Sequence, residues 1–100
     1  CASLDNLGAT QRLLGKLPEA RISLEKGLAI AQEIGAKQTE AEICGDLGML
    51  SMDEAKTNAF VALEKKAEAI TLVKRCIALY TELKHPEAKR WETVLQEIQQ

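Results

Sequence analysis

The sequence has 100 residues, a formal net charge of −2, and 46 % hydrophobic residues, of which only three are aromatic. This length suits one domain with a modest core of aliphatic side chains and alanine, which favours close helix packing and argues against a β-sandwich. The charge balance excludes the strongly cationic face of most nucleic-acid-binding proteins, and no stretch approaches the roughly 20 apolar residues of a membrane span, so we expect neither nucleic acid nor membrane as a partner.

Residues 1–36 are predicted to form a helical hairpin. Apolar and small residues recur at helical spacing from Ala2 to Leu14, and the turn is the segment GKLP from Gly15 to Pro18. Glycine tolerates the left-handed conformation that ends a helix, and proline is well placed in a first helical turn. The second helix should run from about Pro18 to Ile34 and stop at Gly35.

The predicted helix at 18–34 carries apolar residues on more than one side. One stripe contains Ala20, Leu24, Gly27, Leu28, Ala31 and Ile34, whereas Ile22 and Ile30 lie off it. A helix with two apolar sides needs two neighbours, which is typical of a stacked repeat. Within that arrangement, Gly8 and Gly27 are predicted to be small residues at points where two helices approach closely.

Residues 37–84 look like a second, expanded copy of the hairpin. The segment DLG at 46–48 matches NLG at 6–8, and Ala69, Val73 and Cys76 repeat the spacing of Ala20, Leu24 and Gly27. The two matches are shifted by 40 and 49 residues, so the second copy holds nine extra residues (49 − 40) within the stretch from Ser51 to Ile70.

The path of the chain between Ser51 and Ile70 is open, because this stretch contains neither glycine nor proline. Ser51 and Glu54 have the spacing of a capping box, which favours a new helix there and a solvated start for Asp53 and Glu54. One possibility is an extra hairpin with helices at 38–49, 52–65 and 67–83, and another is a first helix extended to about Lys65. Both place a turn near 65–67, which we favour. A third is one unbroken helix from Met52 to Leu83 with an exposed apolar stripe that invites a dimer.

Residues 85–100 are predicted to form a capping helix. The segment KHPEA at 84–88 ends the preceding helix, because a residue before proline avoids the helical region. One side of the last helix is apolar and the other is very polar, as the end of a stack requires. The apolar side holds Ala88, Trp91, Val94, Leu95 and Ile98.

These patterns resemble the tetratricopeptide repeat, whose first helix carries an L-G pair and whose second carries A-x3-F-x2-A. Leu4, Leu7 and Gly8 match the first helix, and Ala20, Leu24 and Gly27 match the second. The resemblance is good over 2–35 and looser over 38–83, with Gln11 and Gln32 at the usual aromatic and proline positions. It implies one all-α domain over 1–100, a solenoid of stacked antiparallel hairpins with a C-terminal cap, cut from a longer array.

The resemblance also implies where a partner would bind, because these arrays usually hold ligands along a concave surface formed by the first helix of each repeat. The corresponding residues are Ala2, Asp5, Ala9, Arg12, Glu42, Gly45, Asp46 and Met49. Repeats that clamp a C-terminal carboxylate carry Lys and Asn where this chain has Asp5 and Ala9, so that ligand is not expected. An acidic surface with one arginine and a flexible methionine suits a basic or amphipathic helical segment of a protein partner.

No catalytic or cofactor-binding pattern is present. His85 is the only histidine, and its place beside Pro86 suits a donor to carbonyls at a helix end. Cys1, Cys44 and Cys76 are too few and too widely spaced for structural zinc or a disulfide framework, so we expect core thiols in a cytoplasmic protein. We therefore expect a non-enzymatic interaction scaffold within a larger regulatory protein. The alternatives are an oligomerisation domain that self-associates through the apolar 52–83 stretch and an accessory domain of an enzyme.

Overall fold

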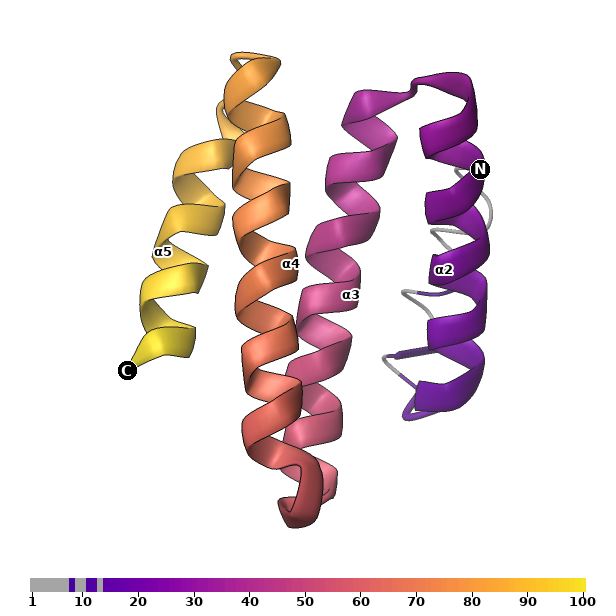
Figure 1. Ribbon diagram of the computed structural model, residues 1–100, viewed down its shortest axis with the longest axis vertical. Helices are drawn as coiled ribbons and strands as arrows, with labels where there is room; N and C mark the ends of the chain where they lie inside the picture. Colours follow the sequence, from indigo (N-terminus) through magenta and orange to yellow (C-terminus); the bar gives the residue numbers. More distant parts are fainter. Residues whose placement is uncertain (1–7, 9–10, 13) are drawn as a thin grey trace.

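The computed structural model of this chain describes residue 8, residues 11–12 and residues 14–100, and within them the fold is all-α. Its helices are α2 (Leu17–Ile34), α3 (Lys37–Thr57), α4 (Ala62–Glu82) and α5 (Glu87–Gln99), with a short 3₁₀ turn, η1, at Ala59–Val61. Adjacent helices run antiparallel (Figure 1). None of these helices combines the length and apolarity that crossing a bilayer requires.

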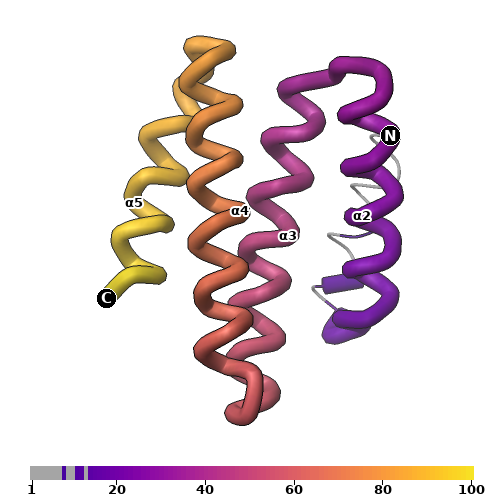
Figure 2. The backbone as a smooth tube through the Cα atoms, viewed as in Figure 1, coloured from indigo at the N-terminus to yellow at the C-terminus, as the bar shows by residue number. Residues whose placement is uncertain are grey.

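The helices stand in a row that follows their order in the chain. α3 packs against α2 on one side and α4 on the other, and α4 packs against α5 (Figure 2). The α3–α4 hairpin is built from the two longest helices, of 21 residues each, and its closed end extends beyond α2 and α5 (Figure 1). The extra residues of the second sequence copy therefore lengthen one hairpin.

The predicted glycine and proline turns are confirmed. Gly15 and Gly35 have φ angles of 79° and 70°, in the left-handed region that glycine tolerates without the steric cost of a side chain. The amide of Gly35 donates to the carbonyls of Ala31 and Gln32 at the end of α2. Pro18 lies in the first turn of α2, where its missing amide hydrogen leaves no bond unmade.

The turn between α3 and α4 lies at 58–61, so the prediction of a turn near 65–67 was wrong. Asn58 leaves the helical conformation with φ −140° and ψ 103°, and its side-chain oxygen accepts a hydrogen bond from the amide of Phe60 at 3.0 Å. This local bond gives the backbone an alternative to continuing the helix. The same break rules out both an unbroken helix from Met52 to Leu83 and a separate helix at 52–65.

The core lies along both sides of α3. On the α2 side it contains Ala20, Leu24, Ala31, Ile43, Leu47 and Leu50. Toward α4 and α5 it contains Ala41, Cys44, Cys76 and Tyr80, with Ala88 and Trp91 packed against them. The prediction that Cys44 and Cys76 are buried free thiols is confirmed, and burial raises their pKa values to about 11 and about 12.

Two glycines allow the helices of each hairpin to approach closely, in matching ways. A Cβ atom on Gly8 would lie 2.5 Å from the Leu24 side chain and 3.3 Å from the carbonyl oxygen of Ala20. On Gly48 it would lie 2.8 Å from the Val73 side chain and 3.4 Å from the carbonyl oxygen of Ala69. The prediction that Gly8 marks a close approach is confirmed. The sequence match between the hairpins therefore corresponds to a shared contact geometry.

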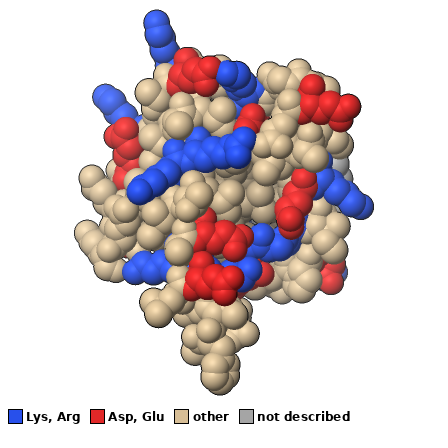
Figure 3. Space-filling model, viewed as in Figure 1, with Lys and Arg blue, Asp and Glu red and all other residues tan. Residues whose placement is uncertain are grey.

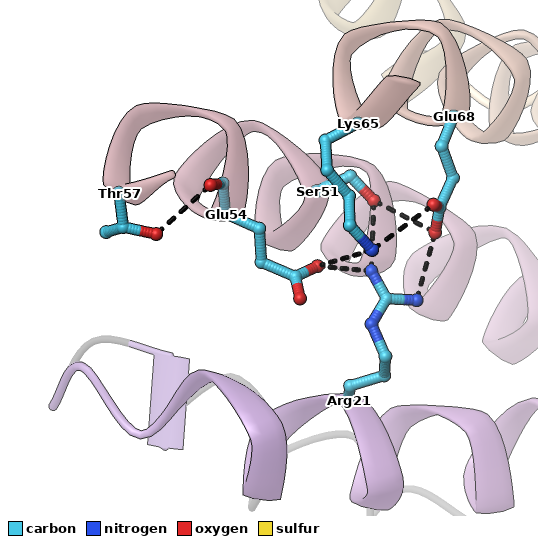
Figure 4. A network of polar contacts seen from close by, with 6 residues as sticks. All are labelled: Arg21, Ser51, Glu54, Thr57, Lys65 and Glu68. Carbon is cyan, nitrogen blue, oxygen red and sulfur yellow. Dashed lines mark hydrogen bonds and ion pairs between the residues drawn. The ribbon is translucent and has the colours of Figure 1, made fainter. Parts of the chain in front are cut away.

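A polar network joins α2, α3 and α4 around the guanidinium group of Arg21 (Figure 4). Arg21 pairs with Glu54 of α3 and, at 2.9 Å, with Glu68 of α4, and it donates to the hydroxyl of Ser51 at 3.3 Å. Lys65 lies 3.7 Å from Glu54 and 3.6 Å from Glu68. Three helices are thus joined through charged hydrogen bonds from one side chain.

The prediction that Ser51 and Glu54 form a capping box at the start of a helix was wrong. Ser51 is fully buried inside α3, and its hydroxyl donates to Glu68 instead of capping a helix. Asp53 and Glu54 do not begin a solvated helix, because Asp53 pairs with Arg12 at 3.0 Å and Glu54 pairs with Arg21. These acidic residues connect the first hairpin to the second.

Helix α5 presents the predicted apolar side to the rest of the domain. Ile98 is buried, and Ala88, Trp91, Val94 and Leu95 are half-buried. The opposite side is exposed and polar. The backbone reverses direction before α5 at Lys84, which has a φ of 54°, followed by the turn at His85 and Pro86.

Candidate functional site

A hollow lies between α3 and α5. Its volume is about 550 Å³, and both charged and aromatic side chains line it. The lining residues are Arg12, Glu42, Asp46, Met49, Tyr80, His85, Glu87, Arg90, Trp91 and Val94. We call this hollow and its continuation along the two helices the α3–α5 groove.

The groove continues toward the closed end of the α3–α4 hairpin. A second hollow of about 190 Å³ shares Met49 and Val94 with the first, and Met52, Lys56, Glu97 and Ile98 complete its lining. On α3, the residues facing the groove recur every three to four positions, because that spacing places side chains on one side of a helix. The two hollows therefore adjoin at Met49 and Val94.

Four of the residues predicted to form a binding surface lie together in this groove. Glu42, Asp46 and Met49 occupy one side of α3, and Arg12, which follows Gly8 and Gln11 in the first helical segment, lies beside them. Arg12 is held in place by its ion pair with Asp53, at 3.0 Å between Nη1 and Oδ2. Ala2, Asp5 and Ala9, which were also predicted, lie outside the described residues.

Gly45 is the predicted surface residue that the structure places elsewhere. It is buried, and a Cβ atom on it would lie 2.5–3.0 Å from three ring atoms of Trp91. Helix α5 therefore covers this part of α3, with the indole ring lying directly over the glycine. Gly45 contributes to the groove only by allowing Trp91 to come close to α3.

Sequence analysis missed the α5 side of the groove and the two aromatic rings at its end. Trp91 and Val94 were assigned to the core-facing side of a capping helix, yet both are half-buried and also line the groove. Tyr80 and His85 come from the end of α4 and the turn that follows it. The ring centroids of these two residues are 4.9 Å apart. One feature of the sequence could have indicated the α5 side of the groove, namely the large side chain of Trp91. An indole ring at the edge of a core is seldom completely buried, so part of it is available to line a surface.

The His85 side chain forms a hydrogen bond at the start of α5, whereas a bond at the end of the preceding helix was predicted. Its Nδ1 accepts a hydrogen bond from the amide of Glu87 at 3.1 Å, in the first turn of α5. The prediction was a donor to carbonyls at the end of the preceding helix. Instead the His85 backbone amide donates to the Tyr80 carbonyl at 2.9 Å. The imidazole ring is therefore an acceptor for the start of α5, where amide hydrogens lack helical partners.

The end of the groove near Tyr80 has a negative electrostatic environment. Burial and then the nearby charge of Glu42 raise the pKa of the Tyr80 hydroxyl, and Glu87 and Asp46 add to the effect. Glu87 is paired with Arg90 at 3.2 Å. The lining of the larger hollow holds three carboxylates and two guanidinium groups, a net charge of −1 (2 − 3).

The chemistry of the groove is suited to binding. Its aromatic and methionine side chains offer apolar contact area, and its carboxylates can accept hydrogen bonds from cationic or amide groups. Among the described residues, no group of three or more His, Cys, Asp or Glu side chains is arranged to hold a metal ion.

Comparison of the chain with known protein families, with curated proteins and with solved structures found no match.

Proposed function

We propose that this chain is a non-catalytic, tetratricopeptide-repeat-like module that binds a peptide or helical segment of a protein partner in the α3–α5 groove. One observation carries the proposal: Arg12, Glu42, Asp46 and Met49, chosen from repeat positions in the sequence, line one hollow. Glu42, Asp46 and Met49 share one side of α3 because of their helical spacing, so the informative part of this observation is that Arg12, from a different segment, lies with them. In the proposed arrangement, α3 and α5 act as first helices of successive repeats.

The repeat interpretation is supported by the matched glycine contacts. Gly8 approaches Leu24 and Ala20 in the way that Gly48 approaches Val73 and Ala69. On this proposal, residues 1–36 are one hairpin, 37–84 an expanded second one, and 85–100 a capping helix. Arrays of stacked repeats keep their packing residues fixed while the surface varies to suit a ligand.

The proposed partner segment is basic and amphipathic. The net negative lining attracts cationic side chains, and the charge of Arg12 is further offset by its pair with Asp53. Met49, Trp91 and Val94 offer apolar surface between these charges. A helix with lysines on one side and leucines on another is complementary to this lining, because helical partners bind through apolar residues at spacings of three and four.

The buried thiols support a reducing location such as the cytoplasm. Cys44 and Cys76 are free and enclosed in the core, and their raised pKa values keep them protonated at neutral pH. Structural disulfides are rare in reducing compartments, where thiols of this kind persist.

A binding assay with a defined probe tests the function. The probe is a fluorescein-labelled amphipathic helix of lysine and leucine, with a glutamate–leucine helix of the same length as its counterpart. Wild-type protein should raise the anisotropy of the lysine peptide and leave that of the glutamate peptide unchanged. Glu42→Lys/Met49→Glu should weaken binding by about tenfold or more, since it reverses one charge and removes one apolar contact.

The matched control is Glu25→Lys/Thr71→Glu, which makes the same kinds of charge change at exposed residues of another hollow and leaves Leu28, which packs against the core, in place. That hollow, of about 420 Å³, lies on α2, α3 and α4 and contains Glu25, Leu28 and Leu72. Binding that is lost in the control and kept in the groove variant would place the ligand on that other surface. Failure of the lysine peptide to bind wild-type protein at all would refute the proposed partner chemistry.

A further inference from the structure

The closed end of the α3–α4 hairpin carries the most exposed apolar side chains in the described part of the chain. Phe60 is fully exposed and Leu63 is 86 % exposed. Both belong to the segment Ala59–Leu63, which we call the hairpin tip. Figure 3 shows the protruding lower end of the molecule without acidic or basic side chains on this face. The tip is therefore an apolar projection.

The exposure of Phe60 is not required by the local fold. The turn is held by the side chain of Asn58, which accepts from the Phe60 amide, and this bond does not depend on which side chain residue 60 carries. Residues 57–63 contain no charged group, although exposed turns are usually polar. Two large apolar side chains at such a site indicate a surface that becomes covered.

The charge around the tip differs in sign from that of the whole chain. From Lys56 to Lys66 there are three lysines and one glutamate, a net charge of +2, so the remainder of the chain carries −4 (−2 − 2). Lys65 is engaged with Glu54 and Glu68. Lys56 is exposed, and half-buried Lys66 has a long contact of 3.5 Å with the Gln100 carbonyl. The apolar tip is thus flanked by cationic groups.

The shape of the tip decides which occupant fits. Two convex tips of a few residues would bury far less than the roughly 1,000 Å² that a stable protein interface needs, which argues against a second copy of this chain. A fluid anionic bilayer needs no complementary pocket: apolar side chains enter the acyl boundary, and lysines contact the headgroups.

We propose that the hairpin tip inserts into the surface of an anionic membrane, with Phe60 and Leu63 in the acyl boundary and Lys56 and Lys66 at the headgroups. This inference does not depend on the ligand of the groove, although Lys56 also lines the groove's continuation. It departs from the expectation of no membrane partner, which considered only spanning segments. Insertion by two apolar side chains is shallow, so the association is reversible and depends on salt.

Vesicle sedimentation with the full chain tests the inference. Wild-type protein should sediment with vesicles of phosphatidylcholine and phosphatidylserine, and much less with phosphatidylcholine alone. Phe60→Ser/Leu63→Ser should lower the partition coefficient by about tenfold or more, because it removes both inserted side chains. Lys56→Gln/Lys66→Gln should lower it by about tenfold on the anionic vesicles only.

The matched control is Ile22→Ser/Ile34→Ser, which removes two exposed apolar side chains from α2, where they are 57 % and 66 % exposed. This variant should bind vesicles as wild type does. Equal loss in the control and the tip variant would overturn the inference, as would unchanged binding of the tip variant. Absence of wild-type binding, together with a dimer in light scattering that the tip variant abolishes, would assign the tip to a second copy instead.

A direct readout separates insertion from loss of fold. After subtraction of the Trp91 signal recorded with wild-type protein under the same conditions, Phe60→Trp should show a blue shift of fluorescence on addition of anionic vesicles, whereas Ile22→Trp should not. A tryptophan at position 60 whose spectrum is unchanged when the protein sediments with the vesicles would contradict insertion of the tip.

Discussion

Replacing Arg21 by methionine should destabilise the domain by about 2 kcal/mol, because the change removes the guanidinium group and keeps most of the apolar stem. The side chains of Arg21, Glu54 and Glu68 are 23 %, 21 % and 35 % exposed, so they lie between the surface and the interior. Exposed ion pairs contribute about 0–1 kcal/mol, whereas removing one partner of a buried pair costs about 3–5 kcal/mol. Two pairs at this intermediate exposure give the value of about 2 kcal/mol.

The assay is urea and thermal unfolding followed by circular dichroism. For a domain of this size, about 2 kcal/mol corresponds to a lower melting temperature by roughly 8–16 °C. Lys37→Met is the control, because it removes the exposed pair with Glu82 and should cost less than about 0.5 kcal/mol. Equal effects of the two substitutions would refute the assigned role of the network.

The difference in stability between wild type and Arg21→Met should also depend on pH. Burial alone would raise the pKa of Glu68, but the charges of Arg21 and Lys65 outweigh it, so the pKa is lowered from its ordinary value of 4.5. A lowered pKa in the folded state stabilises the protein above the ordinary value, and this contribution disappears as the pH falls through and below it. The stability difference between wild type and Arg21→Met should therefore shrink below about pH 4. A difference that stays constant into acid would contradict the electrostatic origin.

Two further predictions concern the core beside the groove. Gly45→Ala should destabilise the protein by about 1–2 kcal/mol, because the steric clash with the rigid Trp91 ring outweighs the helix propensity gained. The fluorescence of Trp91 should shift to the red. Higher stability of this variant in urea would contradict the packing of Trp91 on Gly45. In a Cys1→Ser background, Cys44 and Cys76 should not react with a thiol reagent at pH 8 until denaturant is added, because burial keeps them protonated. Rapid reaction of the native protein would show that one of them is accessible.

Much of the helical architecture could be predicted because its signals are local. Gly15 and Gly35 are needed for left-handed turns, and Pro86 marks the break before the last helix. Gly8 could be assigned to a helix contact because its spacing from other small and apolar residues repeats later in the chain. Each of these inferences depends on a few neighbouring residues and on one period.

The errors arose where distant residues decide the outcome. Ser51 and Glu54 have the spacing of a capping box, but Arg21 and Glu68 from other helices bind them inside α3. The turn at Asn58 depends on one side-chain hydrogen bond in a stretch without glycine or proline. Neither feature can be read from periodicity alone.

The candidate site was predicted on one side only, for a similar reason. Repeat positions located Glu42, Asp46 and Met49 on one side of α3. They could not show that the Trp91 ring would cover Gly45, because that contact joins residues 46 positions apart (91 − 45). The second side of the groove is set by how α5 docks, and docking depends on the packed shape of both helices.

The two sides of the groove differ in how firmly they are held. α3 lies between α2 and α4, whereas α5 is at the end of the described row and packs against α4. Local opening takes the least free energy where an element has few packed neighbours, so amide hydrogens of α5 should exchange with solvent sooner than those of α3. A ligand that touches both sides would slow the exchange of α5 in particular. We therefore expect the α5 side of the groove to open at a lower cost in free energy than the α3 side.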